Sequence, residues 1–473
     1  MGTEKQEVLI IGGGPAGATS AIKLLERGVT PLIVEREKFP RYHVGEAMTG
    51  EGGAIVRELG IHEKLTEEHH TIKHGVNVFG SRGHSDWWVP VMQRTEDKEL
   101  HEIHTYSVRR SQFDQVLLDE ALSRGAEMVD GLATQPIVDE NGVVKGARVA
   151  VGNNGDKREI DLHAEMTLDC SGQATFLANR KATGPKYKGS YDKQIALFSQ
   201  IDSYQRNDGH DRQHGSGNTH IFYKKKYHWA WAIPLDQDLT SVGVVVPAKY
   251  FRDSGLSQAD FIKRELNTLN DGLAGRVPDN VELVEEPHVV PNYSFQVRKF
   301  AGPGYICIGD SHRFVDPIFS FGLYVAMKES GLAVDEVMGW LDGKGRDSDD
   351  PFRPYMHHTE RALDMIEDMI DTFWENPLAF AYMAHRKYRE QVLDMFSGRV
   401  YDGQPVADRD EALSVFRRLL GRERTYDDHG EYSIPIGSRY HPERAPLWNS
   451  NLTDIESTEK WLQNLEEETA GVG

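Results

Sequence analysis

The sequence predicts an α/β protein in which a Rossmann-like dinucleotide-binding domain is combined with a β-sheet domain and a helical C-terminal region. Three observations favour this fold. A glycine-rich turn follows an apolar strand near the N-terminus, strand-like segments dominate residues 186–294, and helical spacing dominates beyond residue 346. At 473 residues the chain exceeds one ordinary core, so two or three subdomains are expected.

The N-terminal segment "EVLIIGGGPAGATSAIKLLERGVTPLIVERE" has the order strand, tight turn, helix and strand. Residues 7–11 form the apolar run expected of a parallel strand buried on both faces. Gly12, Gly14 and Gly17 form a G-x-G-x-x-G pattern, which permits a tight turn, close approach of a pyrophosphate and close helix packing. The second strand ends in Glu35, the acid expected to hydrogen-bond a ribose hydroxyl. This combination predicts a bound dinucleotide.

The composition narrows the choice of partners. With 54 basic and 74 acidic residues, the net charge of −20 repels phosphate backbones and anionic lipid, so neither nucleic acid nor a membrane is an expected partner. Cys170 and Cys307 lie in apolar strand-like segments, which indicates a reducing compartment without disulfides. Histidine pairs such as His69-His70 lack a coherent set of metal ligands. We therefore expect a cytoplasmic protein without a metal.

Three further segments resemble flavin motifs. In "YICIGDSHRF" an apolar strand ends at Gly309-Asp310, "YSVRRSQFDQ" places Arg110 before a Phe-Asp pair, and "LDCSGQATFLANR" contains an Asp-x-Ser-Gly turn. These segments resemble motifs of the glutathione-reductase-type and aromatic-hydroxylase-type flavoproteins. The resemblance implies that FAD is the dinucleotide, with Asp310 and Arg110 in contact with it. No second βαβ fingerprint for a nicotinamide cofactor is present in the sequence.

Four more segments make the resemblance specific: "EREKFPRYHVGEAMTG", "TIKHGVNVFG", "WAWAIP" and "DPIFSFG". With these, residues 6–335 resemble the flavin-dependent halogenases that act on phenols, pyrroles and carrier-tethered aromatics, a group within the superfamily of FAD-dependent aromatic hydroxylases. The resemblance implies catalytic roles for Lys73, Trp229 and Trp231. It implies FAD contacts at Gly12, Gly14, Ala16, Gly17, Glu35, Arg36, Arg41, Arg110 and Asp310, and halide binding at Pro317, Ser320, Phe321 and Gly322.

The two tryptophans alternate along a strand, so both indoles project from the same face. They are interpreted either as a half-buried core or, with the resemblance, as a wall that keeps an aromatic substrate away from the flavin. Two departures from the family pattern are Ala47, where relatives commonly carry Ser, and the bulky Phe321 in the halide turn. We therefore expect an unusual halide preference.

The resemblance also implies a reaction. Reduced FAD from a separate flavin reductase, O2 and a halide (chloride, bromide or iodide) would give hypohalous acid, which Lys73 would direct to an electron-rich aromatic substrate, free or carrier-tethered. A haloamine route needs a neutral lysine, and burial lowers a lysine pKa from its reference value of ~10.4. The alternatives are a flavin-dependent aromatic hydroxylase, a geranylgeranyl-type reductase, or a non-catalytic flavoprotein. A homo-oligomer is left open.

The predicted domain order places the FAD-binding domain in two pieces around a sheet. The expected boundaries are an FAD-binding domain at 1–185, interrupted near 86–99, a roof sheet at 186–294, a return of the FAD-binding domain with the halide turn at 295–345, and a helical region at 346–473. In the last region, the aromatics Phe373, Trp374, Phe380 and Tyr382 are interpreted as a helical core or as a substrate entrance. The tail "TDIESTEKWLQNLEEE" is predicted to form an acidic amphipathic helix.

Overall fold

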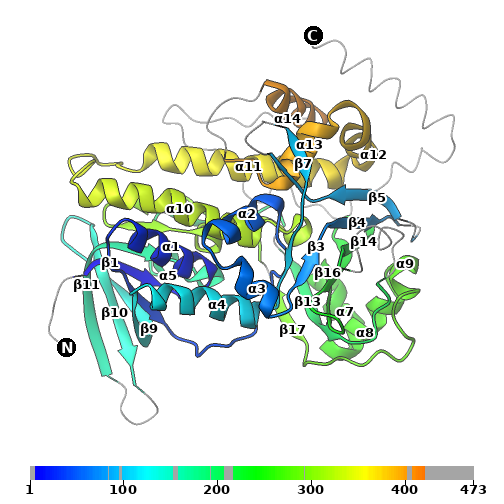
Figure 1. Cartoon of the computed structure of the whole chain (residues 1–473), viewed down its shortest axis with the longest axis horizontal. Coiled ribbons are helices and arrows are strands. Elements are labelled where there is room, and N and C mark those ends of the chain that lie inside the picture. The colour runs from blue at the N-terminus through cyan, green and yellow to red at the C-terminus, as the bar shows by residue number, and fades with distance from the viewer. Residues whose placement is uncertain are drawn as a thin grey trace.

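The structure is a computed structural model that describes residues 6–420, except 82, 84, 95–98, 153–157, 192, 207–216, 292 and 402–406. The predicted acidic tail helix lies outside the described residues. Figure 1 shows two sheets with helices on their outer sides, and a further group of helices above them.

The first sheet holds the predicted dinucleotide fold. Strand β1 (Gln6–Ile11) pairs in parallel with β2 (Leu32–Glu35) and with β11 (Arg158–Asp169), because its apolar residues can be buried on both faces. The other members are β9 (Glu127–Val138), β10 (Val144–Val151), β19 (Ala301–Gly302) and β20 (Tyr305–Cys307). On the sheet pack α1 (Pro15–Glu26) and the long α10 (Gly322–Leu341), and α4 (Arg110–Ser123) packs on α1.

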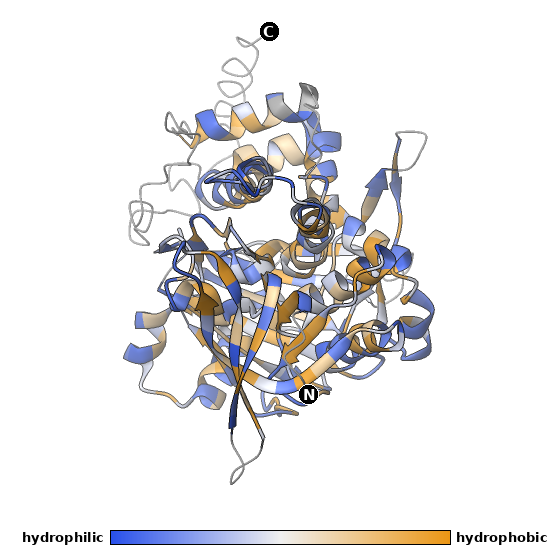
Figure 2. Ribbon diagram, turned by 90° about the vertical axis from the view of Figure 1, so that its left-hand side faces the viewer, coloured by the Kyte–Doolittle hydropathy of each residue, from blue (hydrophilic) through white to orange (hydrophobic). Residues whose placement is uncertain are grey.

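The second sheet forms the roof of the site. Its strand order is β17 (His288–Pro291), β13 (Gln194–Ile201), β16 (Thr240–Pro247), β15 (His228–Pro234), β14 (Thr219–Lys225), β4 (Gly75–Phe79) and β5 (Ser85–Pro90). Its outer face, which includes Ala230 and Ala232, packs on α7 (Ala248–Ser254), α8 (Gln258–Thr268) and α9 (Asp271–Ala274). Figure 2 shows hydrophobic colour on strands near the middle of the molecule. Strands β4 (Gly75–Phe79) and β5 (Ser85–Pro90) belong to this sheet and therefore pack with the roof. The domain boundaries given in the sequence analysis stay a prediction.

Shorter elements connect the two sheets. The helices are α2 (Gly50–Glu58), α3 (His62–Glu67) and α5 (Phe176–Asn179), and the 3₁₀ turns are η1 (Gly172–Ala174), η2 (Gly309–Ser311) and η3 (Pro317–Phe319). The small strand groups are β3 (Thr71–Lys73) with β8 (Thr105–Ser107), β6 (Met92–Arg94) with β7 (Leu100–Glu102), and β12 (Lys186–Lys188) with β18 (Phe295–Val297) and β21 (Arg313–Phe314).

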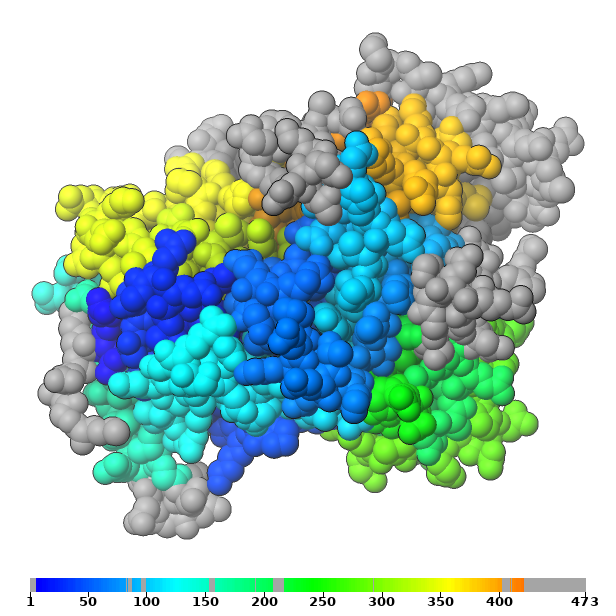
Figure 3. All heavy atoms as spheres, in the orientation of Figure 1, coloured from blue at the N-terminus to red at the C-terminus, as the bar shows by residue number. Residues whose placement is uncertain are grey.

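The C-terminal helices pack on the rest of the molecule. They are α11 (Arg353–Glu375), α12 (Pro377–Tyr382), the π-helical turn η4 (Met383–Lys387), α13 (Arg389–Ser397) and α14 (Ala407–Leu419). Arg94 of β6 pairs with Glu390 and Asp394 of α13 at 3.2 and 3.3 Å, and Figure 3 shows the two regions in direct contact. The aromatic side chains of Phe373, Trp374 and Phe380 are buried, as the core interpretation predicts.

The described helices include none with both the length and the apolar character that a membrane crossing requires. Within the described ranges, no group of three or more His, Cys, Asp or Glu side chains is arranged to hold a metal ion.

Candidate functional site

A cavity of about 410 Å³ lies where the carboxyl ends of β1 and β2 meet the inner face of the roof sheet. Most of the predicted site residues line it: Gly12, Gly14, Ala16, Glu35, Arg36, Arg41, Arg110, Trp229, Trp231, Asp310, Pro317, Ser320 and Gly322. The remaining predicted residues, Gly17, Lys73 and Phe321, are not part of this lining in the described structure. The cavity lies at the carboxyl ends of parallel strands, where open α/β sheets bind their ligands.

The glycine turn packs closely on its neighbours and leaves the start of α1 without a side-chain cap. Gly12 has a φ of +104°, and a β-carbon there would lie 2.5 Å from the carbonyl oxygen of Cys170. A β-carbon on Gly17 would overlap the carbonyl oxygen of Gly12, so Gly17 serves the packing of α1 on the turn. No described side chain caps α1 at Gly14, and its first amides therefore remain available to an anion.

Glu35 is held at the end of β2 by main-chain donors. Its carboxylate accepts hydrogen bonds from the amides of Gly13 and Glu37 at 2.6 and 2.7 Å. Nearby on the cavity wall, Leu132 of β9 is 47% exposed, which is unusual for a large apolar side chain beside a buried site. An anchored carboxylate next to an open apolar surface suits the ribose and the adenine of a dinucleotide.

Arg110 is anchored on the cavity wall at the start of α4. Its guanidinium forms a bidentate pair with Asp114 at 2.7 and 2.8 Å and donates to the carbonyl oxygen of Val44 at 2.6 Å. Arg41 also pairs with Asp114, at 3.4 Å. These guanidinium groups supply positive charge toward a diphosphate without needing to move.

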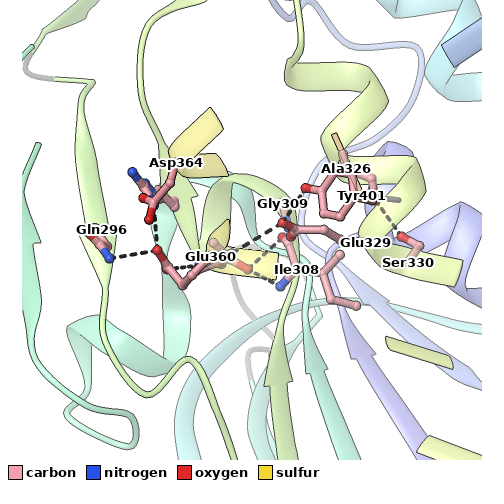
Figure 4. A network of polar contacts seen from close by, with 12 residues as sticks. Gln296, Ile308, Gly309, Ala326, Glu329, Ser330, Glu360, Asp364 and Tyr401 are labelled. Carbon is pink, nitrogen blue, oxygen red and sulfur yellow. Dashed lines mark hydrogen bonds and ion pairs between the residues drawn. The ribbon is translucent and has the colours of Figure 1, made fainter. Parts of the chain in front are cut away.

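The second flavin motif is anchored from behind. Asp310 lines the cavity, and burial raises the pKa of its carboxyl to about 7. The amide of the preceding Gly309 donates to Glu329 of α10 at 2.7 Å, and the Tyr401 hydroxyl donates to the same carboxylate at 3.0 Å. Figure 4 shows this carboxylate beside Gly309, with Glu360 of α11 on the other side of the strand end.

Two residues after Asp310, the chain enters a buried ionic cluster. His312 contacts Glu360 at 2.7 Å, and Arg313 pairs with Glu360, Asp364 and Glu367 of α11 at 2.5, 3.0 and 2.6 Å. Burial opposes the positive charge of His312, but Glu329 and Glu360 outweigh it and raise its pKa. The cluster fixes α11 to the segment between the flavin motif and the halide turn.

The predicted halide turn is built around η3. Asp316 accepts from the amide of Ile318 at 3.0 Å and from the Tyr293 hydroxyl at 3.0 Å, and Ser320 adopts a left-handed conformation with a φ of +60°. Helix α10 then begins at Gly322, and no described side chain caps it. Phe321 is buried in the core. Pro317, Ser320 and Gly322 of the turn line the cavity, whereas Phe321 is not part of this lining.

The two indoles lie side by side on the roof, with ring centroids 5.8 Å apart. Trp229 and Trp231 are 1% and 4% exposed, and both line the cavity. The Trp231 indole donates to the Ser241 hydroxyl at 3.2 Å. The pair is therefore buried in the core and also forms part of the cavity wall, so the two interpretations of the sequence are compatible.

Lys73 lies beyond the cavity wall. Its side chain is 2% exposed, and its ammonium donates to the carbonyl oxygen of Met48 at 3.0 Å. The neighbouring Ala47 lines the cavity, so the segment through Met48 lies between the amine and the flavin side. Burial alone lowers the pKa of Lys73 to about 7. Near neutral pH, a substantial fraction of this amine is therefore uncharged.

Comparisons with known proteins agree with this geometry. A family model described as an FAD binding domain matches residues 5–349. The chain is 33% identical over 415 residues to a 1H-pyrrole-2-carbonyl-(peptidyl-carrier protein) brominase of Pseudoalteromonas luteoviolacea, covering 88% of this chain and 96% of that protein. The chain belongs to the flavin-dependent halogenases. It is also 28% identical over 462 residues to a 1H-pyrrole-2-carbonyl-(peptidyl-carrier protein) chlorinase of Pseudomonas fluorescens, covering 92% of this chain and 99% of that protein.

The solved structure of the flavin-dependent brominase Bmp2 matches this halogenase with a TM-score of 0.79 at 31% identity, covering 88% of this chain and 98% of that one. The halogenase uses FAD, and the hydroxylase alternative is not favoured. The anchored Glu35, the uncapped start of α1 and the exposed Leu132 fit this cofactor.

Glu46 is one of the lining residues that were not among the predicted site residues. Glu46 lies in the cavity with a buried carboxyl group, directly before Ala47. Its position in the Gly-Glu pair of the quoted "VGEAMTG" segment was the available signal, but nothing in the sequence alone distinguishes a buried carboxyl from a surface one.

Proposed function

We propose that this halogenase transfers a halogen to an electron-rich pyrrole ring held on a carrier protein, and that Lys73 directs the transfer. The printed names of the two relatives support the substrate class. The role of Lys73 is supported by its position. Its amine is buried, has a lowered pKa and lies behind a cavity wall that includes Trp229 and Trp231.

The residues around the cavity have separate tasks in this proposal. Bound reduced FAD supplies the electrons that, with O2, convert a halide into hypohalous acid. The main chain at Pro317, Ser320 and Gly322 holds the halide near the uncapped start of α10, where the helix dipole favours an anion. The indoles of Trp229 and Trp231 exclude the ring and water from the flavin side, which limits hydroxylation and side reactions.

Lys73 then acts on the hypohalous acid. The neutral amine either hydrogen-bonds the acid or forms a haloamine: R–NH2 + HOX → R–NHX + H2O. The haloamine gives its halogen to a ring carbon, and the ring proton returns to the nitrogen, so R–NHX + ArH → R–NH2 + ArX. The haloamine route needs an amine without charge for part of the time, which the lowered pKa of Lys73 provides.

The test supplies FAD, a flavin reductase, NADH and a mixture of chloride, bromide and iodide. Three substrates are compared by mass spectrometry: pyrrole-2-carbonyl on a peptidyl carrier protein, free pyrrole-2-carboxylate, and a phenol. Halogen gain on the carrier-bound pyrrole is expected. Halogenation of the free compounds alone would overturn the carrier assignment, and gain of oxygen would support a hydroxylase.

A matched variant tests the lysine in the same reaction. Lys73→Met is expected to bind FAD and oxidise reduced flavin as the wild type does, while its halogenated product falls at least about 100-fold. Regioselective halogenation by Lys73→Met at the wild-type rate would remove the lysine from the proposal.

A further inference from the structure

Glu46 is a buried carboxyl group that faces the cavity without a full set of hydrogen bonds. Its side chain is 2% exposed, and in the described structure its Oε2 atom has no hydrogen-bond partner. A buried ionised oxygen without a partner is costly, whereas a neutral carboxyl can donate its proton to whatever occupies the cavity.

The groups that face Glu46 hold its pKa near neutral. Burial raises the pKa to about 7, and a hydrogen bond from Ser241 together with the charges of Arg110 and Arg109 opposes the rise, while Glu285 adds to it. Arg110 is already paired with Asp114, and Arg109 with Asp236. Each of these arginines is therefore already paired with a carboxylate other than Glu46.

Ser241 connects Glu46 to the indole wall. The Ser241 hydroxyl accepts a hydrogen bond from the Trp231 indole at 3.2 Å and bonds the Glu46 carboxyl. Two other carboxyls near the cavity, Asp310 and Asp316, also have pKa values raised to about 7. Asp316 is occupied by the Ile318 amide and the Tyr293 hydroxyl, and Asp310 is bonded by Gln173. Glu46 differs from Asp316 because its Oε2 atom is buried without a hydrogen-bond partner in the described structure.

The overall reaction consumes a proton inside this cavity. Its balance is FADH2 + O2 + X− + H+ → FAD + HOX + H2O, in which O2 is reduced by four electrons, two from the flavin and two from the halide. A cavity that excludes water leaves few sources for that proton, and a general acid works best when its pKa lies near the working pH.

We propose that Glu46 is the general acid of halide oxidation: its neutral carboxyl gives a proton to the oxygen that leaves as water, and the resulting carboxylate is reprotonated from solvent. The step precedes any transfer to the ring, so it depends on the proposed arrangement of the cavity and not on the identity of the aromatic substrate or on Lys73.

The first test uses the protein without FAD. Infrared spectra of the wild type and of Glu46→Gln are recorded from about pH 5.5 to about pH 8.5, and their difference isolates the carbonyl stretch of a protonated Glu46 from those of Asp310 and Asp316. The band is expected at the acidic end and is expected to disappear as the pH rises through about 7. Absence of the band at the acidic end would overturn the proposal.

The second test measures hypohalous acid with a small-molecule trap and no aromatic substrate, so a wrong carrier or lysine assignment does not affect it. Glu46→Gln keeps the shape of the side chain but has no proton to give, and it is expected to bind oxidised FAD within about twofold of wild type while trapped product falls about 100-fold or more. Glu285→Gln removes a negative charge from the surroundings of Glu46. At the acidic end of the same pH range, this variant is expected to form trapped product at the wild-type rate. Trapping by Glu46→Gln at the wild-type rate would overturn the proposal.

Discussion

The indole of Trp231 lies directly against Gly243 on the neighbouring strand, so closely that a β-carbon on Gly243 would overlap the ring atoms Cζ2 and Cη2. Ser241, two residues earlier on β16, accepts the indole N–H. One strand therefore supplies both the space and the hydrogen bond that set the position of this ring at the cavity wall.

Gly243→Ala is expected to push the Trp231 indole toward the cavity. We expect the free energy of unfolding to fall by about 1–3 kcal/mol, the usual range for overpacking, and FAD to bind more weakly. Chemical denaturation and titration with FAD measure both effects. The control is Gly331→Ala in α10, where no described atom lies within 4 Å of the new carbon and a helical alanine stabilises by about 0.5–1 kcal/mol. Equal behaviour of both variants would contradict the prediction.

Lys73→Met is expected to change how stability depends on pH. The pKa of Lys73 is about 7 in the folded protein and 10.5 in the reference state, so between these values the unfolded chain binds more protons. Wild-type stability should therefore gain up to about 1.4 kcal/mol per pH unit from this group as the pH rises through that window. Lys73→Met lacks this gain, so its stability advantage is largest at and below about pH 7 and shrinks as the pH rises. Denaturation curves at several pH values test this, and parallel curves for the two proteins would speak against a buried neutral amine.

Glu35→Gln is expected to weaken FAD binding about 10-fold or more, because the charged acceptor for the Gly13 and Glu37 amides is lost and such bonds contribute about 1.5–3 kcal/mol. Quenching of FAD fluorescence reports the affinity. Glu26→Gln, on the exposed end of α1, serves as the control and should bind FAD as the wild type does. A wild-type affinity for Glu35→Gln would mean that this carboxylate does not organise the site.

Arg313→Met is expected to lower the free energy of unfolding by about 3–5 kcal/mol, because Glu360, Asp364 and Glu367 would lose their shared cation in a buried setting. Arg148→Met removes an arginine that pairs with Asp161 on an exposed strand, and it should have little effect. Melting temperatures compare the two variants. Similar small losses for both would show that the cluster around Arg313 adds no more than a surface pair does.

The sequence predicted best where chemistry and geometry are local. Gly12 and Glu35 belong to one strand–turn–helix–strand unit, so their spacing alone indicates a dinucleotide turn. The alternation of Trp229 and Trp231 likewise predicts one shared strand face. The position of Lys73 could not be predicted in this way, because it follows from the pairing of β3 with β8 and from a hydrogen bond to Met48, which lie far away in the sequence.

The burial of the acidic residues of α11 is a second feature that the sequence could not predict. Glu360, Asp364, Glu367 and Asp371 recur at helical spacing, a pattern typical of a solvated face. In the structure they are buried, because Arg313 and the Tyr191 hydroxyl meet them from distant segments. Helical spacing in the sequence shows that one face of the helix is charged. The distant residues that pair with this face and allow its burial are seen only in the structure.

The cluster around Arg313 also bears on how members of this family can be recombined. The carboxylates that hold Arg313 come from α11, while Arg313 itself lies between the flavin motif at Asp310 and the halide turn at Asp316. A chimera that takes its C-terminal helices from another halogenase would pair foreign carboxylates with this loop. Crossover points placed outside the whole span from Gly309 to the end of α11 keep the cluster intact, so the C-terminal helices are inherited together with the halide turn as one unit.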